Sequence, residues 1–167
     1  MSTDKLYNDA VGLLKELIAT PSFSKEEDQT AGIICRFLGV KGIEHTRIGN
    51  NVFAYNKFYD AAKASIILNS HHDTVKPNRG YTLDPFKPIE KDVKLFGLGS
   101  NDAGGALVSL IAAFLYYYDK PGLKYNVIIA ATAEEEISGK KRHLYSINAT
   151  KICSIHNHTK LHKKPYD

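Results

Sequence analysis

The amino-acid sequence predicts an α/β fold, and three observations lead to that prediction. Residues 4–42 carry apolar side chains at helical spacing, which indicates two amphipathic helices. Residues 65–71 and 125–133 include apolar runs without helical spacing, as in strands buried on both faces of a sheet. A further helical pattern, residues 106–117, separates these runs, as in a strand–helix–strand unit.

The composition is that of a soluble globular domain. The chain has 167 residues, 43% hydrophobic and 24% charged, enough for one domain with a core. No apolar run is long enough to cross a bilayer, and Met1 to Lys5 lead into a helical pattern rather than an export signal. The two cysteines, Cys35 and Cys153, make no disulfide framework. We therefore expect a cytoplasmic protein that does not enter membranes.

The net charge of +4 is unevenly distributed. Residues 140–167, here called the basic tail, hold seven of the 22 Lys and Arg residues and one of the 18 acids. The basic tail thus carries +6 and the preceding residues −2. A nucleic-acid partner is not expected, because the basic tail has few aromatic residues and no recognisable nucleic-acid-binding module. DNA binding that weakens with salt and is lost on deleting the tail would be needed to support one.

The first elements of the fold are two helices. Residues 4–19 form an amphipathic helix that Thr20-Pro21 ends, because the residue before a proline disfavours helical geometry. Ser24 to Glu27 match a capping box, which predicts the start of a second helix that ends near Gly42. Both helices are expected to pack on a sheet.

Strands and a long loop follow. Residues 44–49 and 52–57 are short strand candidates joined by a hairpin turn, and residues 65–71 are the central buried strand. Residues 76–91 hold four Pro or Gly residues and are predicted to be a surface loop. A loop of this length directly after a candidate site strand often carries function.

The central strand ends in a His-His-Asp cluster. Ligand sites of α/β sheets form at the carboxyl ends of strands, so His71 is a candidate metal ligand. Asp73 points to the same side of an extended chain and could orient the imidazole. The alternative is a structural His–Asp pair. His72 points the other way and is not counted as a ligand.

A strand is expected to end at a glycine-rich turn that contains Asp102, and the third helix follows. Gly97-x-Gly99 suggests a dinucleotide fingerprint, but Asp102 stands where its third glycine belongs, and a carboxylate would repel a pyrophosphate. The glycines instead let the backbone crowd around Asp102, which suits a carboxylate presented to a cation. The alternative is that Asp102 caps the helix.

Three adjacent carboxylates, Glu134 to Glu136, follow the second buried strand. On a solvated loop such a run is ordinary. After a buried strand, the repulsion is larger unless a cation is present. Three strand ends thus carry one imidazole and several carboxylates but no thiolate, which suits a hydrolytic Zn²⁺ or a similar ion, in particular a carboxylate-bridged pair.

These motifs resemble those of a known family. The motifs and their order are similar to those of the acetylornithine deacetylase and succinyl-diaminopimelate desuccinylase family, which includes carboxypeptidase G and aminoacylase. In this chain they are His71-x-Asp73-Thr74-Val75, then Gly97-x-Gly99-x-x-Asp102-x-Gly104-Gly105, then Glu134 to Glu136. The resemblance covers residues 1 to about 140. Within the family, the sequence is most similar to the acetylornithine deacetylase branch. It implies the N-terminal half of a three-layer αβα zinc-exopeptidase-like domain.

The resemblance also implies roles for individual residues. His71 would bind one zinc, Asp102 would bridge two, and Glu136 would bind the second, with Co²⁺ able to substitute. Asp73 would orient His71, and Glu135 would be the general base. The activity implied is metal-dependent amide hydrolysis of an N-acyl amino acid, of the acetylornithine deacetylase type used in arginine biosynthesis. The family also implies a homodimer, whose dimerisation domain we do not find here.

The resemblance ends near residue 139, where a non-family segment is expected. Two later family ligands, an acid and a histidine, have no counterpart, and tail histidines are not expected to replace them. Lys140 to Arg142 can be encoded by a run of adenines, so we interpret the basic tail as a frameshift product that the gene sequence would test. The implied alternatives are an enzyme impaired by truncation and an inactive remnant without enzymatic function.

Overall fold

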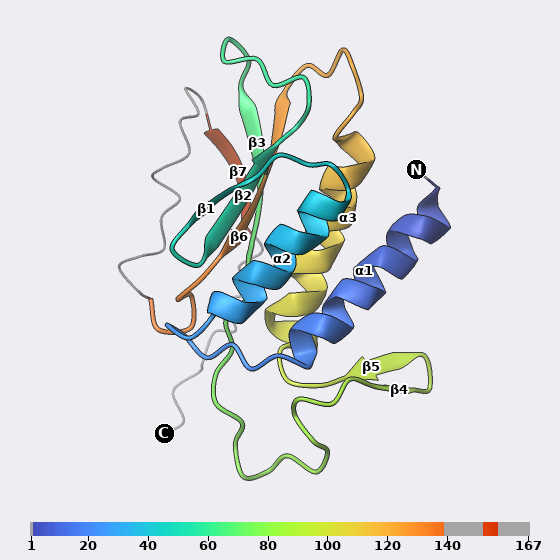
Figure 1. The fold of residues 1–167 in the computed structure, drawn as a ribbon, viewed down its shortest axis with the longest axis vertical. Coiled ribbons are helices and arrows are strands. Elements are labelled where there is room, and N and C mark those ends of the chain that lie inside the picture. Colours follow the sequence, from blue (N-terminus) through green and yellow to red (C-terminus); the bar gives the residue numbers. More distant parts are fainter. Residues whose placement is uncertain (1, 139–151, 157–167) are drawn as a thin grey trace, which may run out of the picture.

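The computed structural model describes residues 2–138 and 152–156, the latter as backbone. Its main feature is a five-stranded sheet of order β1-β2-β6-β3-β7, with three helices beside it (Figure 1). A separate hairpin is made of β4 and β5. The helices are α1 (Thr3–Ile18), α2 (Asp28–Val40), the short η1 (Ser100–Gly104) and α3 (Gly105–Tyr117). The strands are β1 (Thr46–Ile48), β2 (Asn51–Tyr55), β3 (Ser65–His71), β4 (Ile89–Lys91), β5 (Lys94–Phe96), β6 (Asn126–Thr132) and β7 (Ile152–His156).

The sheet is mixed, and its register places two strand ends together. Strand β3 runs parallel to both β6 and β7, whereas β2 is antiparallel to β6 and to β1. In the β3–β6 pair, His71 lies opposite Thr132. The residues that follow these two strands therefore leave the sheet at the same edge.

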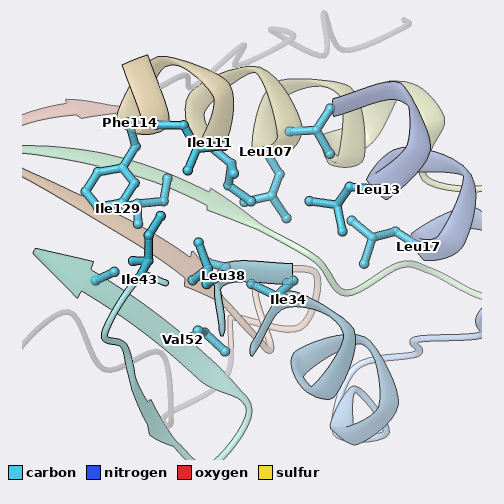
Figure 2. Close-up of a cluster of buried hydrophobic side chains, with 14 of the residues drawn as sticks. Leu13, Leu17, Ile34, Leu38, Ile43, Val52, Leu107, Ile111, Phe114 and Ile129 are labelled. Atoms are coloured by element: carbon cyan, nitrogen blue, oxygen red, sulfur yellow. The ribbon is translucent and has the colours of Figure 1, made fainter. Parts of the chain in front are cut away.

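Helices α1, α2 and α3 lie on one face of the sheet and enclose the main core (Figure 2). All of its labelled side chains are apolar: Leu13, Leu17, Ile34, Leu38, Ile43, Val52, Leu107, Ile111, Phe114 and Ile129. The opposite face carries a smaller buried cluster that includes Ile67 and Ile128. The α/β prediction, with helices on a mixed sheet, is confirmed. Of the three predicted layers, the described residues show the sheet and one layer of helices.

Most predicted elements are present with small shifts of their ends. The helix predicted at 4–19 is α1, and the hairpin of two short strands is β1–β2. The loop predicted at 76–91 ends earlier, because β4 begins at Ile89 and pairs with β5. The sequence did not indicate β7, whose bounds fall within the basic tail.

The predicted capping box is wrong. Helix α2 starts at Asp28, and its N-cap residue, Glu27, makes no side-chain bond to the helix. The Ser24 hydroxyl donates instead to Asp73 Oδ2 at 2.7 Å. The Glu27 carboxylate is fully buried and accepts from the backbone N–H of Glu134. Both side chains serve contacts with distant segments, which outweigh the local capping pattern.

Two further predictions concern the limits of the chain. The boundary at residue 139 and the frameshift at Lys140 to Arg142 lie outside the described residues, apart from the backbone of β7. Among the residues that the structure describes, no helix is both long and apolar enough to span a membrane.

Candidate metal centre

The three predicted metal ligands come together at the carboxyl edge of the sheet. His71 is the last residue of β3, Glu136 lies four residues beyond β6, and Asp102 lies in η1 between β5 and α3. One ligand atom from each lies within 4.8 Å of the other two. The His71 Nε2 to Asp102 Oδ1 distance is 3.3 Å. One imidazole and two carboxylates at this spacing form a donor set that fits a divalent cation such as Zn²⁺.

Asp73 fixes the orientation of the His71 ring. The ring Nδ1 faces two acceptors, the Asp73 carbonyl oxygen at 3.1 Å and Asp73 Oδ1 at 3.3 Å. Nδ1 must therefore carry a proton, and in the neutral ring the lone pair belongs to Nε2. Nε2 faces Asp102, so the ring presents its ligand atom to the candidate site.

The Asp73 carboxylate is completely buried yet well supplied with donors. It accepts from the Ser24 hydroxyl and from the backbone N–H groups of Glu135 and Glu136. Burial raises the pKa of Asp73, but the hydrogen bonds from His71, Ser24 and the two backbone N–H groups outweigh it and lower the pKa to about 2. Asp73 is thus a fixed negative charge beneath the site.

The remaining carboxylates crowd the same space. Glu135 Oε2 lies 3.9 Å from His71 Nε2, on the side of the ring that faces Asp102. Burial raises the pKa of Glu136; the charge of His71 opposes this, while the charges of Asp102, Asp73 and Glu135 add to it. A bound cation would relieve this repulsion between carboxylates.

The alternative role for Asp102 as a helix cap is not observed. Helix α3 begins at Gly105, its N-cap residue is Gly104, and no side chain caps it. The glycines nearby are sterically required, as predicted. A Cβ on Gly104 would lie 2.6 Å from the Gly99 carbonyl oxygen, and Gly99 itself has a φ of +76°. The chain can therefore turn tightly enough to aim Asp102 at His71.

His72 is a structural residue, in line with its exclusion from the predicted ligands. Its ring is buried, with Nδ1 2.9 Å from the Thr30 hydroxyl and Nε2 2.9 Å from the Asn50 carbonyl oxygen. Burial lowers its pKa, which favours the neutral ring. Its contacts join β3 to helix α2 and to the β1–β2 turn.

Three residues around the site were missed by sequence reasoning. Ser24 supports Asp73, Glu27 holds the N–H of Glu134, and Asn51 Oδ1 accepts from the N–H of Ala133. The spacing of Ser24 and Glu27 was noticed but assigned to a helix cap. A signal for Asn51 was its place at the first position of a strand, where a polar side chain is unusual.

The pKa of His71 predicts a pH dependence of metal binding. Burial lowers this pKa, but the hydrogen bond to Asp73 and the charges of Asp73 and Glu135 outweigh it and raise the pKa to about 9. The metal-free imidazole is therefore protonated below about pH 9, and a metal must displace that proton. The apparent affinity for Co²⁺ should rise by roughly tenfold per pH unit between about pH 6.5 and about pH 8.5. Titration calorimetry in two buffers of different ionisation enthalpy measures the proton released; an affinity that is level across this range would contradict the assignment.

The fold and the site together define a class of protein, an α/β domain with a candidate centre of imidazole and carboxylates at the ends of its strands. Comparison with protein families identifies it further. The family described as peptidase family M20/M25/M40 matches residues 67–163, more than half of the chain. The chain belongs to this family, and the resemblance found in its sequence is confirmed.

The similar proteins carry related names. Acetylornithine deacetylase of Proteus mirabilis is 32% identical over 143 residues, covering 77% of this chain and 36% of the relative. Succinyl-diaminopimelate desuccinylase of Blochmanniella floridana is 29% identical over 142 residues, covering 80% and 37%. A solved M20 family metallo-carboxypeptidase from Sulfolobus solfataricus superimposes with a TM-score of 0.64 at 25% identity, covering 77% and 31%. The chain spans about a third of the length of these proteins.

Proposed function

We propose that this chain belongs to a metal-dependent hydrolase that cleaves the amide bond of an N-acyl amino acid. The observation that carries the proposal is the convergence of His71, Asp102 and Glu136 within 4.8 Å, with Glu135 beside them. Family membership supports the reaction type, since the similar proteins include a deacetylase, a desuccinylase and a carboxypeptidase.

The residues present supply part of the ligand set for a pair of Zn²⁺ ions that share one carboxylate, with two ligands for each ion where zinc normally takes three or four. His71 would hold one ion, Glu136 the other, and Asp102 would lie between them. When bound, zinc polarises a carbonyl group and lowers the pKa of water. Asp102 suits the shared position because a carboxylate offers two oxygens and its side chain is 79% exposed.

Each of the other two acids has a separate task. Glu135 is the proposed general base: its Oε2 takes a proton from the attacking water and passes it to the leaving amine nitrogen. Glu135 Oε2 lies 3.9 Å from His71 Nε2, the proposed ligand atom. Glu135 is not one of the three clustered candidate ligands, so its carboxylate is available as a base. Asp73 holds the Nδ1 proton of His71, so that Nε2 stays available as a ligand.

The proposed substrate is acetylornithine or a close analogue. This rests on the residues Ser70 to Pro77, which resemble the acetylornithine deacetylase branch, and on the name of the Proteus relative. The desuccinylase relative makes N-succinyl-diaminopimelate the analogue to compare. The two cysteines without a disulfide framework support a cytoplasmic setting for the reaction.

The test is amide hydrolysis by the purified 167-residue chain. N-acetylornithine and N-succinyl-diaminopimelate are supplied in turn with Zn²⁺ or Co²⁺, and the released amine is measured with and without a chelator. The proposal expects hydrolysis that the chelator abolishes and added metal restores. A folded, metal-loaded chain without activity towards either substrate would favour the inactive remnant instead.

A further inference from the structure

Side chains from three distant segments hold four consecutive backbone N–H groups directly after β6. We call residues 133–136 the acidic turn. The pairs are Ala133 with Asn51, Glu134 with Glu27, and both Glu135 and Glu136 with Asp73, each at 3.1 Å. All three acceptor side chains are buried. The acidic turn carries the proposed base and one proposed ligand, so these acceptors control where those groups lie.

Glu27 is the acceptor whose presence most needs an explanation. Its side chain is 0% exposed, and burying a carboxylate is costly unless donors surround it. The donors are present: Oε1 accepts from the N–H of Lys25 at 2.8 Å and of Glu134 at 3.1 Å, and Oε2 accepts from Asn50 Nδ2 at 2.8 Å. None of these bonds caps helix α2. The Glu27 carboxylate thus links three loops through its hydrogen bonds.

The backbone of the acidic turn needs such support. Glu134 has a φ of +58°, a left-handed conformation that residues other than glycine rarely adopt. A residue keeps such a conformation when its surroundings over-determine it. The bond from the Glu134 N–H to Glu27 acts at that residue. The next two N–H groups along the chain donate to Asp73. The Glu134–Glu27 bond therefore fixes the residue at which the chain turns towards His71.

We propose that Glu27 is a positioning residue for the candidate metal centre: by holding the Glu134 amide, it sets the acidic turn so that Glu135 and Glu136 face His71. The link to metal binding rests on the proposed function, whereas the link to the turn does not. Glu27 lies outside the three-residue cluster of candidate ligands and acts on the acidic turn through the backbone N–H of Glu134.

The experiment uses the full chain and two measurements. Amide hydrogen exchange of residues 134–136 in the metal-free protein reports the turn, and Co²⁺ titration by visible absorption reports the site. Glu27→Ala removes both acceptor oxygens. Glu27→Asp keeps the carboxylate but shortens the side chain by one methylene, so that it no longer reaches the Glu134 N–H. Glu27→Gln keeps one oxygen that can accept from the Glu134 N–H.

Two control variants separate position from stability. Glu26→Gln changes the neighbouring carboxylate, which is exposed. Ile34→Val trims a buried side chain of the same helix that packs in the main core, away from the acidic turn and from His72. Ile34→Val should therefore lower the thermal midpoint without altering exchange at residues 134–136 or the Co²⁺ spectrum.

The expected result is faster exchange at residues 134–136 in Glu27→Ala and Glu27→Asp, with Co²⁺ affinity weakened by roughly 10- to 100-fold. Glu27→Gln should restore both measurements most of the way. If Glu27→Ala does not fold, the measurements on Glu27→Asp test the positioning role of Glu27. Wild-type exchange in folded Glu27→Asp would overturn the inference, and so would wild-type Co²⁺ binding. A wild-type chain that binds no Co²⁺ would count against the proposed function, and exchange alone would then decide the role of Glu27.

Discussion

Replacing Glu135 by glutamine should lower amide hydrolysis by about 10²- to 10⁴-fold and leave metal binding intact. The carboxylate oxygen that lies 3.9 Å from His71 Nε2 is the proposed proton acceptor for the attacking water. A glutamine side chain has nearly the same shape but does not accept a proton at neutral pH. The loss should fall on kcat rather than KM, because the group acts in the transition state. Steady-state hydrolysis of N-acetylornithine with Co²⁺ measures both constants.

Glu134→Gln is the matched control for this change. It removes the same charge from the adjacent position, where only the backbone N–H has a role in the proposed mechanism. Its kcat should stay near that of the wild type. Equal losses in the two variants would indicate a general charge effect and remove Glu135 from its assigned role. Metal content measured on both purified variants excludes a loss of cation as the cause.

Replacing Asp73 by alanine should destabilise the metal-free chain by about 3–5 kcal/mol. The carboxylate is 0% exposed and accepts from the Ser24 hydroxyl and from two backbone N–H groups of the acidic turn. Its removal leaves these part-buried donors without their acceptor, and an unpaired donor that is fully buried typically costs about 1–3 kcal/mol. The His71 imidazole also loses one of its two Nδ1 acceptors, the Asp73 carboxylate, and keeps the Asp73 backbone carbonyl. Urea denaturation followed by circular dichroism measures the free energy of unfolding.

Two further variants define the scale of this effect. Asp73→Asn keeps one acceptor oxygen and should fall between the wild type and Asp73→Ala. Asp119→Ala removes an exposed aspartate and should change stability by less than about 0.5 kcal/mol. If Asp73→Ala unfolds at the same urea concentration as Asp119→Ala, the network around Asp73 does not hold the site together.

The sequence predicted those parts of the protein that depend on local pattern. A continuous apolar run is enough to predict a buried strand, so β3 and β6 were expected within a few residues of their observed ends. Because parallel strands carry ligands at their carboxyl ends, the polar residues after these runs became the candidate site. The structure then brought His71, Asp102 and Glu136 together.

Other features escaped prediction because short strands carry a weak pattern. Strand β4 has three residues whose side chains are exposed or half-buried, which gives little alternation to detect. Of its partner β5, the sequence indicated the strand end before the glycine-rich turn but not the pairing with β4. The role of Asp102 was left open for a different reason. A helix cap and a site carboxylate need the same residue type at the same place, and only the path of the chain through η1 separates them.

The sequence by itself therefore determined the main helices, the longer strands and the residue types that gather at the site. The tertiary structure alone decided that Ser24 and Glu27 leave the local capping pattern and hold segments about 50 and about 110 residues away. The physical reason is burial. Once the sheet and helices close around them, these polar groups lose water and must bond to the donors and acceptors that the fold places within reach, however distant in sequence.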